Sequence, residues 1–173
     1  MMKLMAFLIV ILISGCSGQR LDDYRGTSPE FDVQRFFNGP LQADGVVLNH
    51  AGVVARRFSV KMVGTWQDNV GKLEEWFVFD DGEKTTRTWI ITQLDNGRYS
   101  GTAGDIHGKA VGEAAGFALH WDYQLDIKVD NSHYRVTFDD WLYQINNKTV
   151  INRSYIKKWG INVGEVILVI NKQ

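Results

Sequence analysis

Cysteine and proline are almost absent from the chain of 173 residues, which contains 1 Cys and 2 Pro. A single Cys excludes a disulfide scaffold and a metal cluster built on several thiolates, and two prolines exclude a proline-rich linker protein. An excess of positive charge is also missing, because 19 Lys and Arg face 20 Asp and Glu and leave a net charge of −1. This balance argues against binding to the phosphates of nucleic acid.

The residue patterns of common catalytic and metal sites are missing as well. The 4 His are far apart in sequence and form neither His-x-His nor His-Glu-x-x-His, and there is no Gly-x-Ser-x-Gly elbow. The adjacent carboxylates Glu74-Glu75 and Asp139-Asp140 point to opposite faces if they lie on strands, so neither pair is suited to general acid and base catalysis. We therefore expect no enzyme activity, no metal and no cofactor.

The N-terminus has the pattern of an export signal. Lys3 precedes an apolar run, Leu4 to Ile13, that is too short to span about 30 Å of hydrocarbon at roughly 1.5 Å per residue. The run ends in Ile13-Ser14-Gly15-Cys16, which resembles the bacterial lipobox, where the Cys is acylated after cleavage ahead of it. The sequence predicts a signal peptide at 1–15 and a lipid, such as palmitate, on Cys16. The alternatives are an ordinary secretory signal and an uncleaved anchor.

Lipidation of Cys16 predicts a location in the cell envelope. Two or three acyl chains attach a protein to a membrane in effect permanently. Position 17 is Ser, whereas Asp after the Cys favours inner-membrane retention in lipoproteins of enteric type, so a Gram-negative source implies the outer membrane, facing the periplasm. Residues 16–27 are the lipidated Cys and a polar stretch that we expect to be a flexible tether. Residues 28–173 are expected to form one domain.

Hydrophobic alternation with a period of two dominates that domain. From Leu119 to Val129, apolar residues alternate with polar or charged ones, which is typical of a strand with one buried face. Ser28-Pro29-Glu30 has the pattern of a helix start, and we expect one or two helical turns ending by Gly39-Pro40. The segment from Val163 to Ile170 is apolar on nearly both faces, which favours a strand covered on both sides or a closing strand beneath the helix.

The strand pattern predicts an all-β fold. Turn signals recur between about nine or ten strand segments, which is typical of a meander of hairpins. An open meander of this length exposes two edges, and closure removes them. We therefore expect an antiparallel up-and-down barrel with a short N-terminal helix. The tripeptide Gly64-x-Trp66 matches a lipocalin signature, although chance alone produces such a match easily.

Several motifs along the chain resemble one family. They are Phe36-Phe37-Asn38-Gly39, Leu73 to Gly82, Arg87-Thr88-Trp89, Tyr99-Ser100-Gly101, Ala103 to Gly108, Trp121-Asp122-Tyr123, Phe138 to Trp141, Lys158-Trp159-Gly160 and Gly164-Glu165. Together they are similar to a Gram-negative outer-membrane lipoprotein family known as domain of unknown function 3833. The resemblance implies a lipocalin-like, calycin-type barrel and brings no established activity. His107 and Trp159 depart from the family pattern.

Polar residues on apolar strand faces are the candidate binding residues. Glu75 shares a face with Leu73 and Phe77, and Arg87 shares one with Trp89, so a hairpin between them brings the carboxylate and guanidinium together. This pair either fixes strand register or anchors a lipid head group or carboxylate in a cavity. Ligand contacts are also expected from Trp121 and Tyr123, and from a second polar and aromatic face near the C-terminus that includes Arg153 and Tyr155.

Two hypotheses about function remain open. In the first, a barrel tethered to the membrane by its N-terminal lipid binds or carries a lipid or another hydrophobic ligand. In the second, side chains fill the barrel, and the protein has a structural or assembly role through a protein partner. Barrel size separates them, because eight strands can be filled by side chains whereas nine or ten enlarge the lumen. The sequence does not identify the ligand or the oligomeric state.

Overall fold

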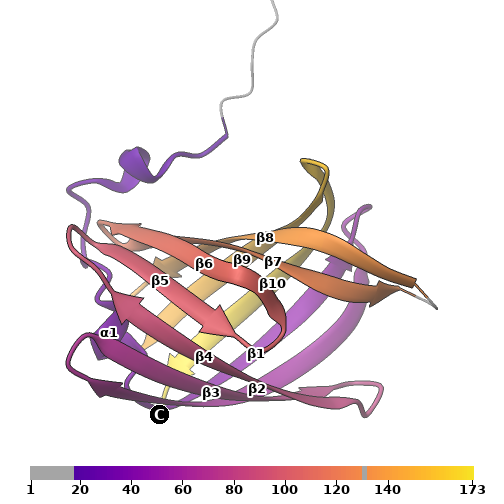
Figure 1. Cartoon of the computed structure of the whole chain (residues 1–173), viewed down its shortest axis with the longest axis horizontal. Helices are drawn as coiled ribbons and strands as arrows, with labels where there is room; N and C mark the ends of the chain where they lie inside the picture. The colour runs from indigo at the N-terminus through magenta and orange to yellow at the C-terminus, as the bar shows by residue number, and fades with distance from the viewer. Residues whose placement is uncertain (1–17, 130–131) are drawn as a thin grey trace, which may run out of the picture.

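Ten antiparallel strands form a closed barrel in the computed structural model, which describes residues 18–129 and 132–173 (Figure 1). The elements in chain order are η1 (Leu21–Tyr24), α1 (Val33–Phe36), β1 (Gly39–Asn49), β2 (Val54–Gln67), β3 (Val70–Phe79), β4 (Lys84–Gln93), β5 (Arg98–Ala103), β6 (Ile106–Ala115), β7 (Ala118–Val129), β8 (Ser132–Gln144), β9 (Thr149–Lys158) and β10 (Ile161–Lys172). The predicted signal peptide and Cys16 lie outside the described residues.

Each strand pairs with the next one along the chain, and β1 also pairs with β10 to close the barrel. Closure gives every strand a neighbour on both sides, although the first half of β4 extends beyond its pairing with the short strand β5. The all-β, up-and-down barrel with about nine or ten strands and a short N-terminal helix is thereby confirmed. The predicted strand from Leu119 to Val129 matches β7, where Leu119, Trp121 and Leu125 are buried.

The short helix α1 closes one end of the barrel, at the left of Figure 1. Phe36 and Phe37 are almost completely buried there, and their rings meet edge to face at 5.1 Å between centroids. The helix begins after Asp32, whose carboxylate accepts a hydrogen bond from the backbone N–H of Arg35 at 2.9 Å. The predicted start at Ser28-Pro29-Glu30 was wrong, because this stretch runs outside the helix and leads to Phe31, which is buried.

Two side chains from the barrel wall hold this closed end in place. Trp66 donates an indole hydrogen bond to the carbonyl of Phe37 at 3.0 Å. A Cβ on Gly64 would lie 1.8 Å from the same carbonyl oxygen, so only glycine fits against it. From the last strand, Lys172 Nζ donates to the carbonyls of Arg35 and Phe36 at 2.8 and 3.0 Å. The Gly64-x-Trp66 tripeptide therefore positions α1 and Phe37, which form a plug at this end of the barrel. It has this structural role although the tripeptide is a weak sequence signal.

The segment before α1 packs on the outside of the barrel. The Tyr24 ring meets those of Phe117 and Tyr143 at centroid distances of 5.3 and 5.8 Å, and Thr27 Oγ1 accepts a hydrogen bond from the backbone N–H of Phe117. Farther upstream, Gln19 accepts a hydrogen bond from the Tyr143 hydroxyl at 2.8 Å. The prediction of a flexible tether through residue 27 was therefore wrong for its second half, where aromatic contacts fix the chain.

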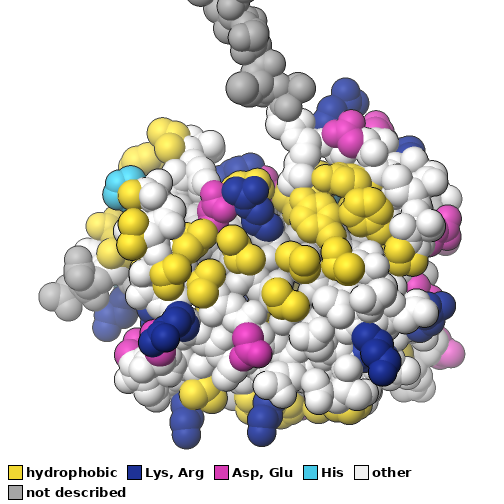
Figure 2. All heavy atoms as spheres, turned by 180° about the vertical axis from the view of Figure 1, so that it is seen from behind, with side chains coloured by type: hydrophobic (Ala, Val, Ile, Leu, Met, Phe, Trp, Pro, Cys, Tyr) yellow, Lys and Arg dark blue, Asp and Glu magenta, His cyan; other side chains and the backbone are white. Residues whose placement is uncertain are grey.

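The last strand, β10, is a closing strand that pairs with β1 and β9. Its outward side chains Val163 and Val169 are more than a third exposed, so β10 is not covered on both sides. Val169 lies beside Ile151 of β9 in the sheet. Figure 2, which views the barrel from behind, shows apolar side chains among charged ones on this outer surface. None of the helices in the described residues is long and apolar enough to cross a membrane.

Candidate binding cavity

A cavity of about 560 Å³ occupies the barrel interior. Its wall is mainly apolar and rich in aromatic rings, namely Phe58, Phe77, Phe79, Trp89, Trp121 and Phe138. Val33 and Phe37 form its floor at the end that α1 closes. At the opposite end the lining residues Thr85 and Asp105 are exposed, so the cavity reaches solvent there.

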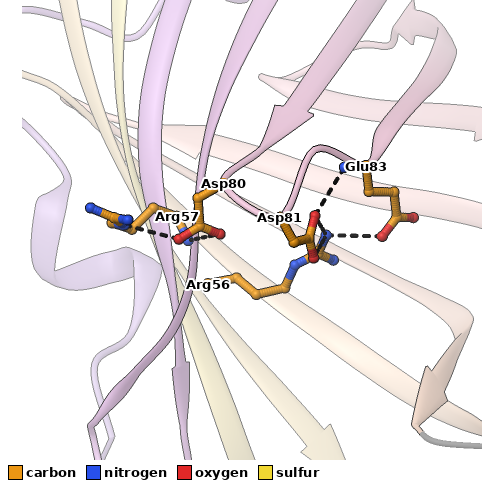
Figure 3. Close-up of polar contacts among 5 residues, drawn as sticks. All are labelled: Arg56, Arg57, Asp80, Asp81 and Glu83. Carbon is orange, nitrogen blue, oxygen red and sulfur yellow. Dashed lines mark hydrogen bonds and ion pairs between the residues drawn. The ribbon is translucent and has the colours of Figure 1, made fainter.

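An arginine with two carboxylates lies beside that open end. Arg56 pairs with Asp81 at 2.6 Å and with Glu83 at 2.9 Å, which ties β2 to the turn between β3 and β4 (Figure 3). Its guanidinium stacks on the cavity-lining ring of Phe79 at 3.8 Å from the centroid. Arg57 points elsewhere and pairs with Asp80 (Figure 3). The sequence located this turn but gave no signal for the ion pairs that hold it.

Glu75 and Arg87 both line the cavity, and they lie directly opposite each other on β3 and β4. The guanidinium of Arg87, however, donates two hydrogen bonds to Asp105 Oδ2, from Nε at 2.9 Å and from Nη2 at 2.6 Å. The structure therefore brings the two predicted residues together but gives Arg87 a different hydrogen-bonded partner. Asp105 lies in the turn after β5, and the sequence does not reveal which residue of this turn faces Arg87.

Glu75 is surrounded by protein, and the part of its surface that neighbours leave free faces the cavity. Burial raises the pKa of Glu75 to about 7, against the opposing effect of the Arg87 charge. A carboxyl in this position binds its proton close to neutral pH. It therefore changes near neutral pH from a neutral hydrogen-bond donor to a carboxylate that the Arg87 charge and the Trp89 indole stabilise only in part.

Asp140 is a second carboxyl in the same cavity, and sequence reasoning missed it. It lies on β8 with its side chain in the cavity wall, and burial raises the pKa of Asp140 to about 7. Its Oδ1 oxygen is buried and has no hydrogen-bond partner among the described residues. The signal was present, because Asp140 shares strand parity with the apolar residues Val136 and Phe138.

Aromatic rings surround the polar residues of the cavity. Tyr123 stacks on Phe138 with 5.3 Å between centroids, and it meets Trp89 edge to face at 5.2 Å. Burial raises the pKa of Tyr123 well above its ordinary value, so its hydroxyl keeps its proton. Trp121 contacts Trp89 edge to face at 5.7 Å. All three aromatic residues predicted in this region, Trp89, Trp121 and Tyr123, line the cavity.

Two glycines make room for the indole of Trp121. A Cβ added to Gly101 or Gly112 would lie 2.6 or 2.3 Å from that ring. Real Cβ atoms do not approach so closely, so the ring lies in a recess that only glycine on β5 and β6 provides. This recess fixes the Trp121 indole in the cavity wall.

The structure does not bring Arg153 and Tyr155 to the cavity. Arg153 pairs with Glu165 at 2.9 Å and stacks on Tyr155 at 4.7 Å from the ring centroid, on the outer surface of β9. Among the inward residues of that strand, Asn152 and Ser154 are buried and line the cavity. The polar and aromatic face exists, but the choice of it as a ligand site was wrong, because β9 turns its polar small residues inward.

On the outer face of the barrel, two histidines each lie beside a carboxylate. His120 lies 2.8 Å from Asp139 Oδ1, and Lys157 pairs with the other oxygen. These hydrogen bonds outweigh burial and lower the pKa of Asp139 to about 2. His107 likewise lies 3.0 Å from Asp126. Within the described residues, no group of three or more His, Cys, Asp or Glu is placed to hold a metal ion.

Fold and cavity together define a lipocalin-like barrel with a ligand-sized interior. Residues 10–172 match the family described as "Protein of unknown function (DUF3833)", and the chain belongs to that family. The S-type phycobiliprotein lyase CPES from Guillardia theta has a similar fold, with a TM-score of 0.55 at 9% sequence identity over 83% of this chain and 94% of that one. No curated protein matches the chain significantly.

Proposed function

We propose that this protein is a lipid-anchored lipoprotein of the bacterial cell envelope that binds or carries a hydrophobic molecule in its barrel without acting as an enzyme. The observation that carries the proposal is the cavity of about 560 Å³ with a mainly apolar, aromatic wall. Its size falls within the range of roughly 300–1,000 Å³ typical of small-molecule sites. A few polar groups inside it would orient the bound molecule.

The alternative hypothesis, a barrel filled by its own side chains, receives less support. Ten strands enlarge the lumen beyond what side chains of a minimal barrel fill. The rings that line the wall leave the central space free, and the cavity reaches solvent beside Thr85. A molecule from outside can therefore enter at the end opposite α1.

The proposed anchor rests on the sequence of the first sixteen residues. Gln19, near the start of the described chain, is held against Tyr143 of β8. Three residues span at most about 11 Å, so a lipid on Cys16 would keep this side of the barrel close to the membrane surface. Ser at position 17 supports the outer membrane of a Gram-negative cell, with the barrel in the periplasm.

The name of the structural neighbour does not change the proposal. At 9% identity the similarity carries the fold, so a lyase reaction is not transferred to this chain. Binding needs only the cavity and its polar groups, which are present.

The test is to purify the full chain from a bacterial envelope and identify what leaves with it by native mass spectrometry and solvent extraction. We expect an apolar molecule at close to one per chain. Leu168→Trp would place an indole in the cavity and should reduce that occupancy. Val169→Trp is the matched control, because the neighbouring side chain points outward from the same strand and is 38% exposed. Empty wild-type protein, or equal occupancy in both variants, would refute the proposal.

A further inference from the structure

The cavity carries more acidic than basic groups. Its charged lining residues are three carboxyls, Glu75 on β3, Asp105 after β5 and Asp140 on β8, and one guanidinium, Arg87 on β4. Tyr123 on β7 is the remaining titratable lining residue, and it keeps its proton. With all three carboxyls ionised, the net charge of this group is −2.

The single cation is already engaged. Arg87 donates two hydrogen bonds to Asp105, while Asp140 Oδ1 has no hydrogen-bond partner among the described residues. Glu75 and Asp140 therefore share, as their counter-ion, a guanidinium that is already hydrogen-bonded to Asp105. A buried carboxylate that lacks a cation costs several kcal/mol, and a bound group of opposite charge removes that cost.

We infer that the polar end of the bound molecule is a cationic amine that meets Glu75 and Asp140, and that the remainder of the molecule is apolar. This inference rests on the proposed function and specifies the ligand class. A fatty acid would instead bring a fourth carboxylate into a group that already has an excess of negative charge. The walls also suit a cation, because the rings of Tyr123, Trp89 and Phe138 lie beside these carboxyls in the cavity.

The test compares three probes that share one alkyl tail: dodecylamine, dodecanol and dodecanoate. The full chain is held in solution by an amphipathic polymer too large to enter the cavity, and each probe displaces the neutral fluorophore N-phenylnaphthylamine. At about pH 8 the amine is cationic and the carboxyls are ionised, so we expect the amine to bind at least about tenfold more tightly than dodecanoate, with dodecanol between them. At about pH 5 protonation of the carboxyls should shrink this preference.

The double variant Glu75→Gln with Asp140→Asn removes both carboxylates with little change in shape. We expect it to bind dodecanol as the wild type does and to lose most of the preference for the amine. The matched control is Glu74→Gln with Asp139→Asn, which alters the adjacent, outward-facing carboxyls; it should keep the preference. Circular dichroism melts establish that both variants are folded.

The outcomes separate the inference from the proposed function. If no probe displaces the fluorophore, the cavity takes no apolar ligand and both fail. If dodecanoate binds as tightly as the amine or more tightly, the inference fails while ligand binding stands. A preference for the amine that survives in the double variant at Glu75 and Asp140 also overturns the inference, because its source would lie elsewhere.

Discussion

Relative to the wild type, the variant Glu75→Gln should gain stability in the empty barrel as pH rises through neutrality. Burial raises the pKa of Glu75 from 4.5 to about 7 in the folded protein. The folded state therefore binds this proton more tightly than the unfolded chain does. Stability is fully retained below about pH 4.5, falls as pH rises through the window up to about pH 7, and has reached its lower level above it.

The size of the effect follows from the width of that window. A difference of about 2.5 pKa units at about 1.4 kcal/mol per unit gives a loss of about 3 kcal/mol for wild type between acid and alkaline pH. Gln cannot ionise, so the variant lacks this loss. The buried amide adds an unpaired polar group, but its cost of about 1–3 kcal/mol is the same at every pH.

The assay is urea unfolding of residues 18–173, which contain all ten strands, at several values between about pH 4.5 and 8.5. The measured quantity is the difference in unfolding free energy between Glu75→Gln and wild type. We expect it to grow with pH by up to about 3 kcal/mol and then level off above about pH 7. Glu74→Gln is the control, because Glu74 points outward and pairs with Lys72 at 2.8 Å. A difference that stays constant with pH would refute the assignment of Glu75 as a buried carboxyl without its own counter-ion.

Three further predictions test other parts of the structure. Cys16→Ala should abolish palmitate labelling and membrane association while the circular dichroism spectrum stays that of a β protein; undiminished labelling would contradict the lipobox. Arg87→Ala should lower the unfolding free energy by about 3–5 kcal/mol above pH 7, since it leaves Asp105 and the other cavity carboxyls without a cation, and by less near pH 4; an equal loss at both pH values would count against this reasoning. Trp66→Phe removes the hydrogen bond to Phe37 and should cost about 1–2 kcal/mol in urea unfolding; unchanged stability would show that the bond does not hold the plug.

Strand parity alone predicted much of the fold and part of the cavity. Alternation along β7 assigned Trp121 and Tyr123 to one face of the strand. Alternation on β3 and β4 assigned Glu75 and Arg87 to the face that lines the cavity. The barrel followed from the length of the meander, since closure removes exposed edges. These inferences succeeded because the period of two is a property of the backbone and does not depend on what fills the interior.

The errors arose where the interior is a cavity instead of a filled core. On β9 the polar and aromatic face with Arg153 and Tyr155 was chosen for its ligand-like side chains, but strand parity places it outside, and the cavity is lined instead by Asn152 and Ser154. Asp140 was set aside because adjacent carboxylates diverge, although that divergence is what places it inside while Asp139 stays outside. Asp105 depends on the register after a turn, which single-sequence patterns do not determine.

The unmatched carboxyls argue for a binding role over a purely structural one. A pair that only fixed strand register would be satisfied within the fold, as Arg57 and Asp80 are on the outer surface. Glu75 and Asp140 instead hold their protons to about pH 7 at a cost to the stability of the empty barrel once they ionise. An apolar residue at either position would remove that cost, and such local inconsistencies are expected at functional sites. A cationic group in the cavity would offset that cost, so a cationic ligand should raise the unfolding free energy by more above neutral pH than in acid, while the stability of the empty barrel falls.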